Sequence, residues 1–150
     1  MNYKIKVING PNINMLGIRE KNIYGNKSYE DLCDMMKEKA DQLEIDIDFF
    51  QSNHEGAIVD CIQVCYKKYD GIIINPAAYT HYSIAILDAI KTVLIPTVEV
   101  HLSDITKRED FRKHSVTKDA CIAQVYGKGM DGYITALQIL LKNFKKTIDK

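Results

Sequence analysis

A histidine with a carboxylate two positions before it is the first candidate for acid–base chemistry in this sequence. Glu99 and His101 lie in the segment TVEVH, and the two-residue period of a strand places both side chains on one face. A carboxylate so placed can accept the ring N–H of the histidine, fix its tautomer and raise its basicity. The spacing predicts an oriented acid–base histidine, and an exposed histidine at a strand end is the alternative.

A second candidate region is the long polar loop after the first apolar segment. It contains Asn12, Arg19 and Tyr24, and loops of this length are commonly lids or binding loops. Of the 20 Lys and Arg residues, only Arg19, Arg108 and Arg112 are arginines. A guanidinium is favoured for carboxylate recognition, so these positions are informative. A surface charge beside a tyrosine packed over the sheet edge, and a mixed-charge helical turn around residues 108–113, remain open alternatives.

Polar residues also follow the segment GIII. Asn75 ends this predicted strand, where its side-chain amide would meet a ligand bound beside the sheet. Thr80 is expected to cap the next helix, which would place His81 at a helix start, where a bound anion is favoured. A simple capping role is the alternative. Since His54 and Glu55 are adjacent and lack a metal-ligand spacing, no metal site is expected.

The elements that must position these residues alternate between strand-length apolar segments and longer segments of helical period, which is typical of a parallel sheet covered by helices. The predicted strands are Lys4–Asn9, Asp46–Gln51, Gly71–Asn75, Thr97–His101 and Cys121–Tyr126. The predicted helices are Ser28–Leu43, Gly56–Tyr69, Tyr82–Val93 and Asp131–Ile148. We expect five βα units in one domain over residues 1–150: an α/β, doubly wound, flavodoxin-like three-layer sandwich with a five-stranded parallel sheet. Ligands of such sheets bind at the carboxyl ends of the strands, where the polar residues gather.

Composition excludes several classes of function. The 20 basic residues balance 20 acidic ones, so nucleic acid is not expected as the main partner, although a local basic patch is possible. The sequence shows no signal peptide and no membrane-spanning segment, which predicts a cytoplasmic protein without a membrane partner. The four cysteines include no C-x-x-C pair and are interpreted as small apolar core residues.

Several ordered motifs resemble the type II 3-dehydroquinate dehydratases: INGPNINMLG with Arg19 and Tyr24, QSNHEG, INPAAYTHYS, and VEVHLSD followed by REDFRKHS. They extend over the first four predicted strands and their loops. The resemblance implies a cofactor-free loss of water from 3-dehydroquinate to give 3-dehydroshikimate, with anti stereochemistry through an enolate. It places the chain in the shikimate pathway of aromatic amino acid biosynthesis.

The resemblance also implies five catalytic roles. Tyr24 would remove the proton beside the ketone, with Arg19 stabilising its anion, and Asn12 would act on the enolate oxygen through a bound water. His101, steadied by Glu99, would protonate the departing hydroxyl. Lowering the pKa of a tyrosine from about 10 to about 7–8 requires roughly 3–4 kcal/mol of preference for the anion, much of which a close guanidinium can supply.

The remaining implied roles concern substrate binding and assembly. The substrate carboxylate would be held by Asn75 and by the backbone N–H groups of Leu102 and Ser103. The ring hydroxyls would be contacted by His81 and Arg112. Within a homododecamer built from trimers, the side chain of Asp88 would reach a neighbouring subunit's site. The sequence departs from the commonest family pattern at Ala78, Leu87, Asp104 and Thr106.

Three other functions fit the sequence less well. A receiver-like switch needs acidic residues after the first strand and at the end of the third, where this chain has Asn9, Asn12 and Asn75. A flavin- or nucleotide-binding module needs a glycine-rich phosphate loop, and none follows any predicted strand. A catalytically inactive relative that binds a ligand or a protein is disfavoured because the residues with implied chemical roles are all present.

Overall fold

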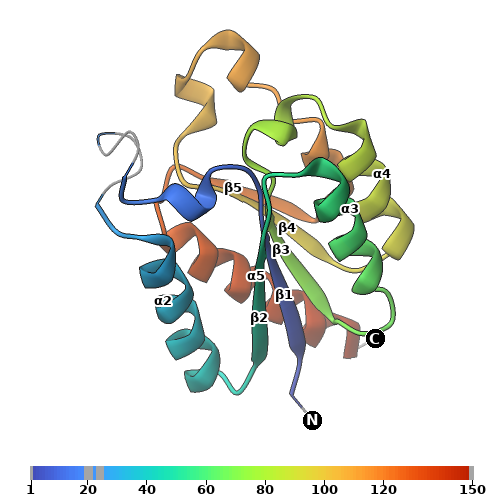
Figure 1. The fold of residues 1–150 in the computed structure, drawn as a ribbon. Coiled ribbons are helices and arrows are strands. Elements are labelled where there is room, and N and C mark those ends of the chain that lie inside the picture. Colours follow the sequence, from blue (N-terminus) through green and yellow to red (C-terminus); the bar gives the residue numbers. More distant parts are fainter. Residues whose placement is uncertain (1, 19–21, 23–25, 149–150) are drawn as a thin grey trace.

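Five parallel strands form one sheet in the order β2-β1-β3-β4-β5. The computed structural model describes residues 2–18, 22 and 26–148, and Figure 1 shows the sheet between two layers of helices. The strands are β1 (Lys4–Asn9), β2 (Asp46–Gln51), β3 (Gly71–Asn75), β4 (Thr97–His101) and β5 (Ala123–Tyr126). The doubly wound, flavodoxin-like fold is therefore confirmed, and four of the five strands have their predicted bounds.

Two helices cover each face of the sheet. The helices α2 (Tyr29–Gln42) and α5 (Asp131–Ile148) lie on one face, and α3 (Glu55–Val64) and α4 (Ile84–Val93) lie on the other (Figure 1). Because strand side chains alternate between faces, Ile73 joins the α2 and α5 core while Ile72 and Ile74 join the α3 and α4 core. No helix in the described part of the chain is long and apolar enough to cross a membrane.

Side-chain caps fix where two of the helices begin. Ser28 and Asp31 form a reciprocal capping box at the start of α2. At α4 the cap is Ser83, whose hydroxyl accepts the N–H of Ile86 at 3.0 Å. The prediction that Thr80 caps this helix was wrong. Residues Ala77–His81 form a 3-10 turn instead, and the Thr80 hydroxyl is buried against other hydroxyls.

The connection between β4 and β5 differs from the prediction. It contains three 3-10 turns, η3 (Ile105–Lys107), η4 (Asp110–Arg112) and η5 (Thr117–Ala120), so the expectation of five complete βα units was wrong. The charged sequence here lacks an apolar stripe that could cover the sheet. Arg112 in η4 forms an ion pair of 2.9 Å through Nε with Glu109, the residue just before this turn.

Two other predicted boundaries also moved. The helix predicted to reach Tyr69 ends at Val64, and the chain then turns through Lys67, which has a left-handed φ of 60°. The strand predicted from Cys121 begins at Ala123, because η5 extends to Ala120 and Cys121 forms its C-cap. Apolar patterning extends past both ends, so it could not show where the backbone changes direction.

At the carboxyl edge of the sheet, the segments that follow β1 and β3 lie very close together. The sheet order reverses here, since the chain passes from β1 outward to β2 and then back to β3. Gly10 donates its N–H to the carbonyl of Asn75 at 2.8 Å. A Cβ on Gly10 would lie 2.5 Å from the carbonyl oxygen of Pro76, so only glycine fits between these segments.

Gly10→Ala should lower the free energy of unfolding by about 1–3 kcal/mol, because the backbone of residues 75–76 must move away. Gly56→Ala is the matched control. Its added Cβ would meet nothing within 4 Å, so this change in α3 should stabilise by about 0.5–1 kcal/mol. Urea unfolding of both variants measures the two effects. Equal stability of Gly10→Ala and the wild type would contradict the close approach.

Candidate active site

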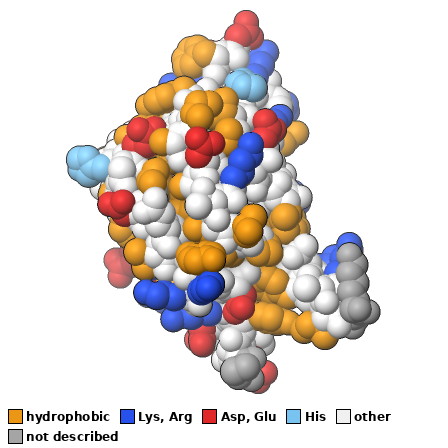
Figure 2. Space-filling view, turned by 90° about the vertical axis from the view of Figure 1, so that its right-hand side faces the viewer, with side chains coloured by type: hydrophobic (Ala, Val, Ile, Leu, Met, Phe, Trp, Pro, Cys, Tyr) orange, Lys and Arg blue, Asp and Glu red, His pale blue; other side chains and the backbone are white. Residues whose placement is uncertain are grey.

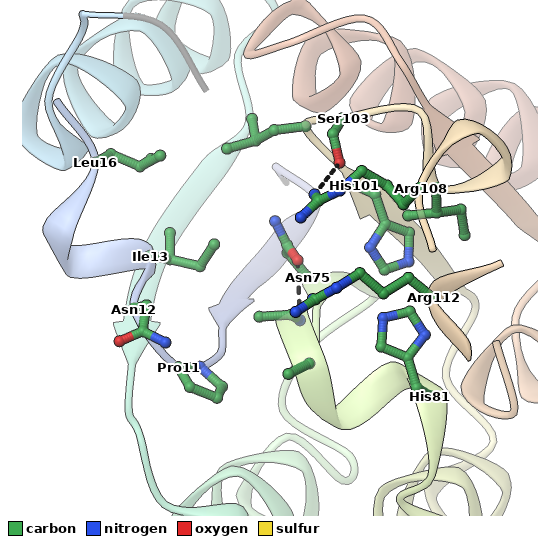
Figure 3. Close-up of a pocket in the computed structure, with 14 residues that line it drawn as sticks. Pro11, Asn12, Ile13, Leu16, Asn75, His81, His101, Ser103, Arg108 and Arg112 are labelled. Atoms are coloured by element: carbon green, nitrogen blue, oxygen red, sulfur yellow. Dashed lines mark hydrogen bonds between the residues drawn. The ribbon is translucent and has the colours of Figure 1, made fainter. Parts of the chain in front are cut away.

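A pocket with a volume of about 150 Å³ lies at the carboxyl ends of β1, β3 and β4. Its lining comes from the segments that follow these strands (Figure 3). After β1 it is lined by Pro11, Asn12, Ile13 and Leu16. After β3 it is lined by Asn75, Ala77, Ala78 and His81, and from β4 onward by His101, Leu102, Ser103, Ile105, Arg108 and Arg112. The polar clusters of the sequence therefore meet in one place.

The predicted pair on β4 is present. His101 Nε2 lies 2.9 Å from Oε2 of Glu99, and both residues are buried. A carboxylate can only accept a hydrogen bond, so Nε2 of His101 carries a proton. The other ring nitrogen, Nδ1, is left to contact a ligand in the pocket. Val98 and Val100 point to the opposite face and join the α5 core. Strand alternation thus delivers the histidine to the site and the valines to the core.

Glu99 is fully buried and carries a negative charge. Burial alone would raise the pKa of its carboxyl, but hydrogen bonds from His101, Thr117 and Ser115 outweigh burial and lower the pKa to about 2. Gln124, its neighbour on β5, also donates to Oε2 at 2.7 Å. The carboxylate is therefore a fixed charge behind His101.

His81 presents the opposite nitrogen arrangement at the pocket. Its Nδ1 lies 2.7 Å from the carbonyl oxygen of His114 and so carries the proton. Burial lowers the pKa of His81, and the nearby His101 and Arg112 lower it further, against the effect of the carbonyl. A neutral ring with Nε2 unprotonated can accept a hydrogen bond from a ligand hydroxyl.

Asn75 is oriented by a buried tyrosine from the end of the chain. Its Nδ2 donates to the Tyr133 hydroxyl at 3.0 Å, and its Oδ1 accepts the N–H of Ala77 at 3.0 Å. Tyr133 in turn donates to Oδ1 of Asn9 at 2.6 Å. Burial raises the pKa of Tyr133, so the hydroxyl keeps its proton and its role as a donor.

The turn after β4 is held from behind by the segment that follows β5. Gly129 and Gly127 donate their N–H groups to the carbonyls of Leu102 and Ser103, at 3.0 and 3.1 Å. Arg108 donates to the Ser103 hydroxyl at 3.3 Å. In Figure 3, Arg108, Arg112 and the two histidines lie on one side of the pocket, and Ile13 and Leu16 lie on the other. One wall is cationic and suits an anionic ligand, and the other is apolar.

The first loop is braced by the motif QSN. The N–H of Asn12 donates to Oδ1 of Asn53 at 3.0 Å, and Gln51 donates to the carbonyl of Gly10 at 3.1 Å. Asn12 has a left-handed φ of 70°, a conformation that asparagine tolerates better than most residues. These contacts hold Asn12 at the pocket edge.

Most of the predicted site residues meet at this pocket. The described residues that line it include Asn12, Asn75, His81, His101, Leu102, Ser103 and Arg112, with Glu99 directly behind His101. Asp88 is exposed on α4 and is not among the described lining residues. Arg19 and Tyr24 lie outside the described residues. The described residues include no group of three or more His, Cys, Asp or Glu that could hold a metal.

Sequence reasoning missed two kinds of lining residue. Arg108 received no role in the site, although the scarcity of arginines marked its position as informative. Ile13, Leu16 and Ile105 carried no signal, because apolar residues near a strand end are expected in any core.

Comparisons with known proteins agree with this geometry. A family described as Dehydroquinase class II matches residues 3–141. The chain is 61% identical over 143 residues to a 3-dehydroquinate dehydratase of Clostridium perfringens (strain SM101 / Type A), covering 95% of this chain and 98% of the relative. Type II dehydroquinase structures from Butyrivibrio crossotus and Propionibacterium acnes superimpose with TM-scores of 0.92 and 0.90, at 54% and 38% identity. Each covers 93% of this chain and 97% of its own.

The depressed pKa of Glu99 predicts an acid-dependent contribution to stability. In the folded protein the pKa of Glu99 is about 2, below its ordinary value of 4.5. The ionised carboxylate therefore stabilises the fold above about pH 4.5, and this stabilisation is lost as the pH falls toward 2. Between about pH 6 and about pH 3 the wild type should lose about 2 kcal/mol relative to Glu99→Gln. Urea unfolding across this range measures the difference.

Glu38→Gln, on the exposed side of α2, is the control for the change from carboxylate to amide. A constant gap between wild type and Glu99→Gln at every pH would show that Glu99 is not an ionised acceptor in the folded protein.

Proposed function

The chain belongs to the Dehydroquinase class II family, and we propose that it forms one catalytic domain in which the residues of the pocket dehydrate 3-dehydroquinate. One observation carries this assignment of roles. A buried carboxylate orients His101 into a cationic pocket that also contains Asn75. An oriented proton donor beside an anion-binding wall is what an elimination of water from a hydroxylated carboxylate requires.

The reaction begins with removal of the proton beside the ketone. We assign the base to Tyr24 as a phenolate, with the guanidinium of Arg19 stabilising the anion. The electron pair of the broken C–H bond forms an enolate, and Asn12 stabilises the enolate oxygen through a bound water. The enolate then collapses to the conjugated ketone, and the C–O bond to the hydroxyl breaks. His101 acts here as the imidazolium: Nε2–H stays on Glu99, and Nδ1 gives the departing hydroxyl the proton that makes it water. No cofactor takes part.

Substrate binding is assigned to the cationic wall. Asn75 and the N–H groups of Leu102 and Ser103 hold the carboxylate, because the carbonyls of that turn are already bound by Gly129 and Gly127. His81 and Arg112 contact the ring hydroxyls. Fixed donors of this kind lose little freedom when the substrate binds, so the hydroxyl that leaves stays in line with His101.

Assembly and location are also part of the proposal. We assign a homododecamer of four trimers, in which Asp88 reaches a neighbouring subunit's site. Figure 2 shows apolar side chains across the face that carries α3 and α4, and Tyr82, Ile84 and Leu94 at the ends of α4 are 62%, 56% and 85% exposed. We place the enzyme in the cytoplasm, a reducing compartment that suits its four unpaired cysteines.

Addition of 3-dehydroquinate should produce the ultraviolet absorbance of the conjugated enone carboxylate. Tyr24→Phe should lower kcat by at least about 100-fold and leave KM within about tenfold, since it removes the base and not the binding contacts. Tyr66→Phe, on an exposed tyrosine, is the matched control. A near-normal rate for Tyr24→Phe would remove Tyr24 from the role of base. No product from folded wild-type protein would overturn the assignment and favour a binding function.

A complementation experiment tests the role of Asp88. Asp88→Ala and Tyr24→Phe chains should each be nearly inactive alone. When they are co-expressed at equal levels, about a quarter of the sites should combine an intact Tyr24 with an intact Asp88 from a neighbour. Turnover of the purified mixture should rise to about that fraction of wild type. If the mixture stays as inactive as its parents, Asp88 does not act across subunits.

A further inference from the structure

The two oxygens of the Glu99 carboxylate are held very differently. Oε2 accepts from three groups: His101 Nε2 at 2.9 Å, Ser115 Oγ at 2.8 Å and Gln124 Nε2 at 2.7 Å. Oε1 accepts from the Thr117 hydroxyl, its one hydrogen-bond donor within residues 2–18, 22 and 26–148. The orientation of the whole carboxylate thus depends on a single hydroxyl at one of its ends.

The rotation of a carboxylate about its last bond is soft, because torsions of this kind have broad minima. Donors gathered on one oxygen fix the position of that oxygen but leave the other free to swing. A donor on the second oxygen fixes the plane. In Glu99 this matters for chemistry, because the lone pair that meets Nε2 of His101 lies in that plane.

Thr117 is well anchored for such a role. Thr117 is fully buried, and its hydroxyl lies 2.7 Å from the Thr80 hydroxyl. The Thr80 hydroxyl also lies 2.7 Å from the Ser115 hydroxyl. Since Ser115 and Thr117 donate their protons to Glu99, Thr80 is the donor to one of them. The N–H of Val116 donates to the carbonyl of Thr80 at 2.8 Å. Backbone and hydroxyls together hold the segment against the residue that precedes His81.

We propose that Thr117 is a positioning residue for the dehydration. Its hydroxyl fixes the plane of the Glu99 carboxylate, and the carboxylate in turn holds Nδ1 of His101 on the hydroxyl that leaves. This inference rests on the proposed role of His101 as the acid. Thr117 itself lies behind Glu99 and is not among the described residues that line the pocket.

Two substitutions separate this role from simple packing. Thr117→Val keeps the shape of the side chain and removes the hydroxyl, and Thr117→Ser keeps the hydroxyl and removes the methyl group. We expect Thr117→Val to lower kcat about tenfold with KM within about twofold, and Thr117→Ser to recover most of this loss. If packing alone mattered, Thr117→Ser would be the more damaged variant.

A double-mutant cycle with Glu99→Gln tests whether Thr117 acts through Glu99. In the Glu99→Gln background residue 99 has no charge for the hydroxyl to hold. Adding Thr117→Val there should change kcat by less than about twofold. An undiminished tenfold effect in that background, or equal losses for Thr117→Val and Thr117→Ser, would overturn the proposal.

Controls keep the result interpretable. Thr135→Val, on α5 away from the pocket, should leave kcat unchanged. Thermal unfolding shows whether each variant folds. If Thr117→Val does not fold, Thr117→Cys replaces the hydroxyl with a weak thiol donor and should lower kcat at least about threefold.

His101→Ala separates the proposed role of Thr117 from that of His101. Normal turnover of this variant would refute the role of His101, whereas a large loss combined with an unaffected Thr117→Val would refute only the role of Thr117.

Discussion

The site depends on an ionised carboxylate buried inside the protein. Glu99 has no exposed surface, so its charge is tolerated only because hydrogen-bond donors from four other residues converge on it. They come from β4 itself, from β5 and from the segment at η5, which fixes these parts of the chain relative to one another. His101 is one of those donors, and satisfying the buried charge is what aims the histidine at the pocket.

A second constraint is the contact between the ends of β1 and β3. Gly10 lies so close to Asn75 and Pro76 that no side chain fits between them, and the hydrogen bond from Gly10 to Asn75 holds the two segments together. Tyr133 extends from α5 to the ends of these strands, where its hydroxyl hydrogen-bonds to both Asn9 and Asn75. The side-chain amide of Asn75 is therefore positioned by the last helix of the chain, through the core and not through the loops.

Charge is separated within the pocket in a way that fits the reaction. The negative charge of Glu99 lies behind His101, away from the substrate, while Arg108 and Arg112 face the cavity. An anionic ligand thus meets positive groups and an imidazole that Glu99 holds in place from behind. His81 stays neutral beside them because burial and the neighbouring positive charges lower its pKa.

Strands, helices and the residue types of the site could largely be predicted from local sequence patterns. Period-two alternation put Glu99 and His101 on one face, and the apolar runs marked four of the strands with their bounds, because both signals are local. Which distant groups meet could be seen only in the folded chain. Thr117 and Gln124 reach Glu99 across 18 and 25 positions, and Tyr133 reaches Asn9 across 124. Nothing in the sequence distinguishes these three residues from other polar residues, because their partners, the Glu99 carboxylate and the amides of Asn9 and Asn75, come close only in the fold. Hydrogen bonds depend on distance in space, which local periodicity does not encode.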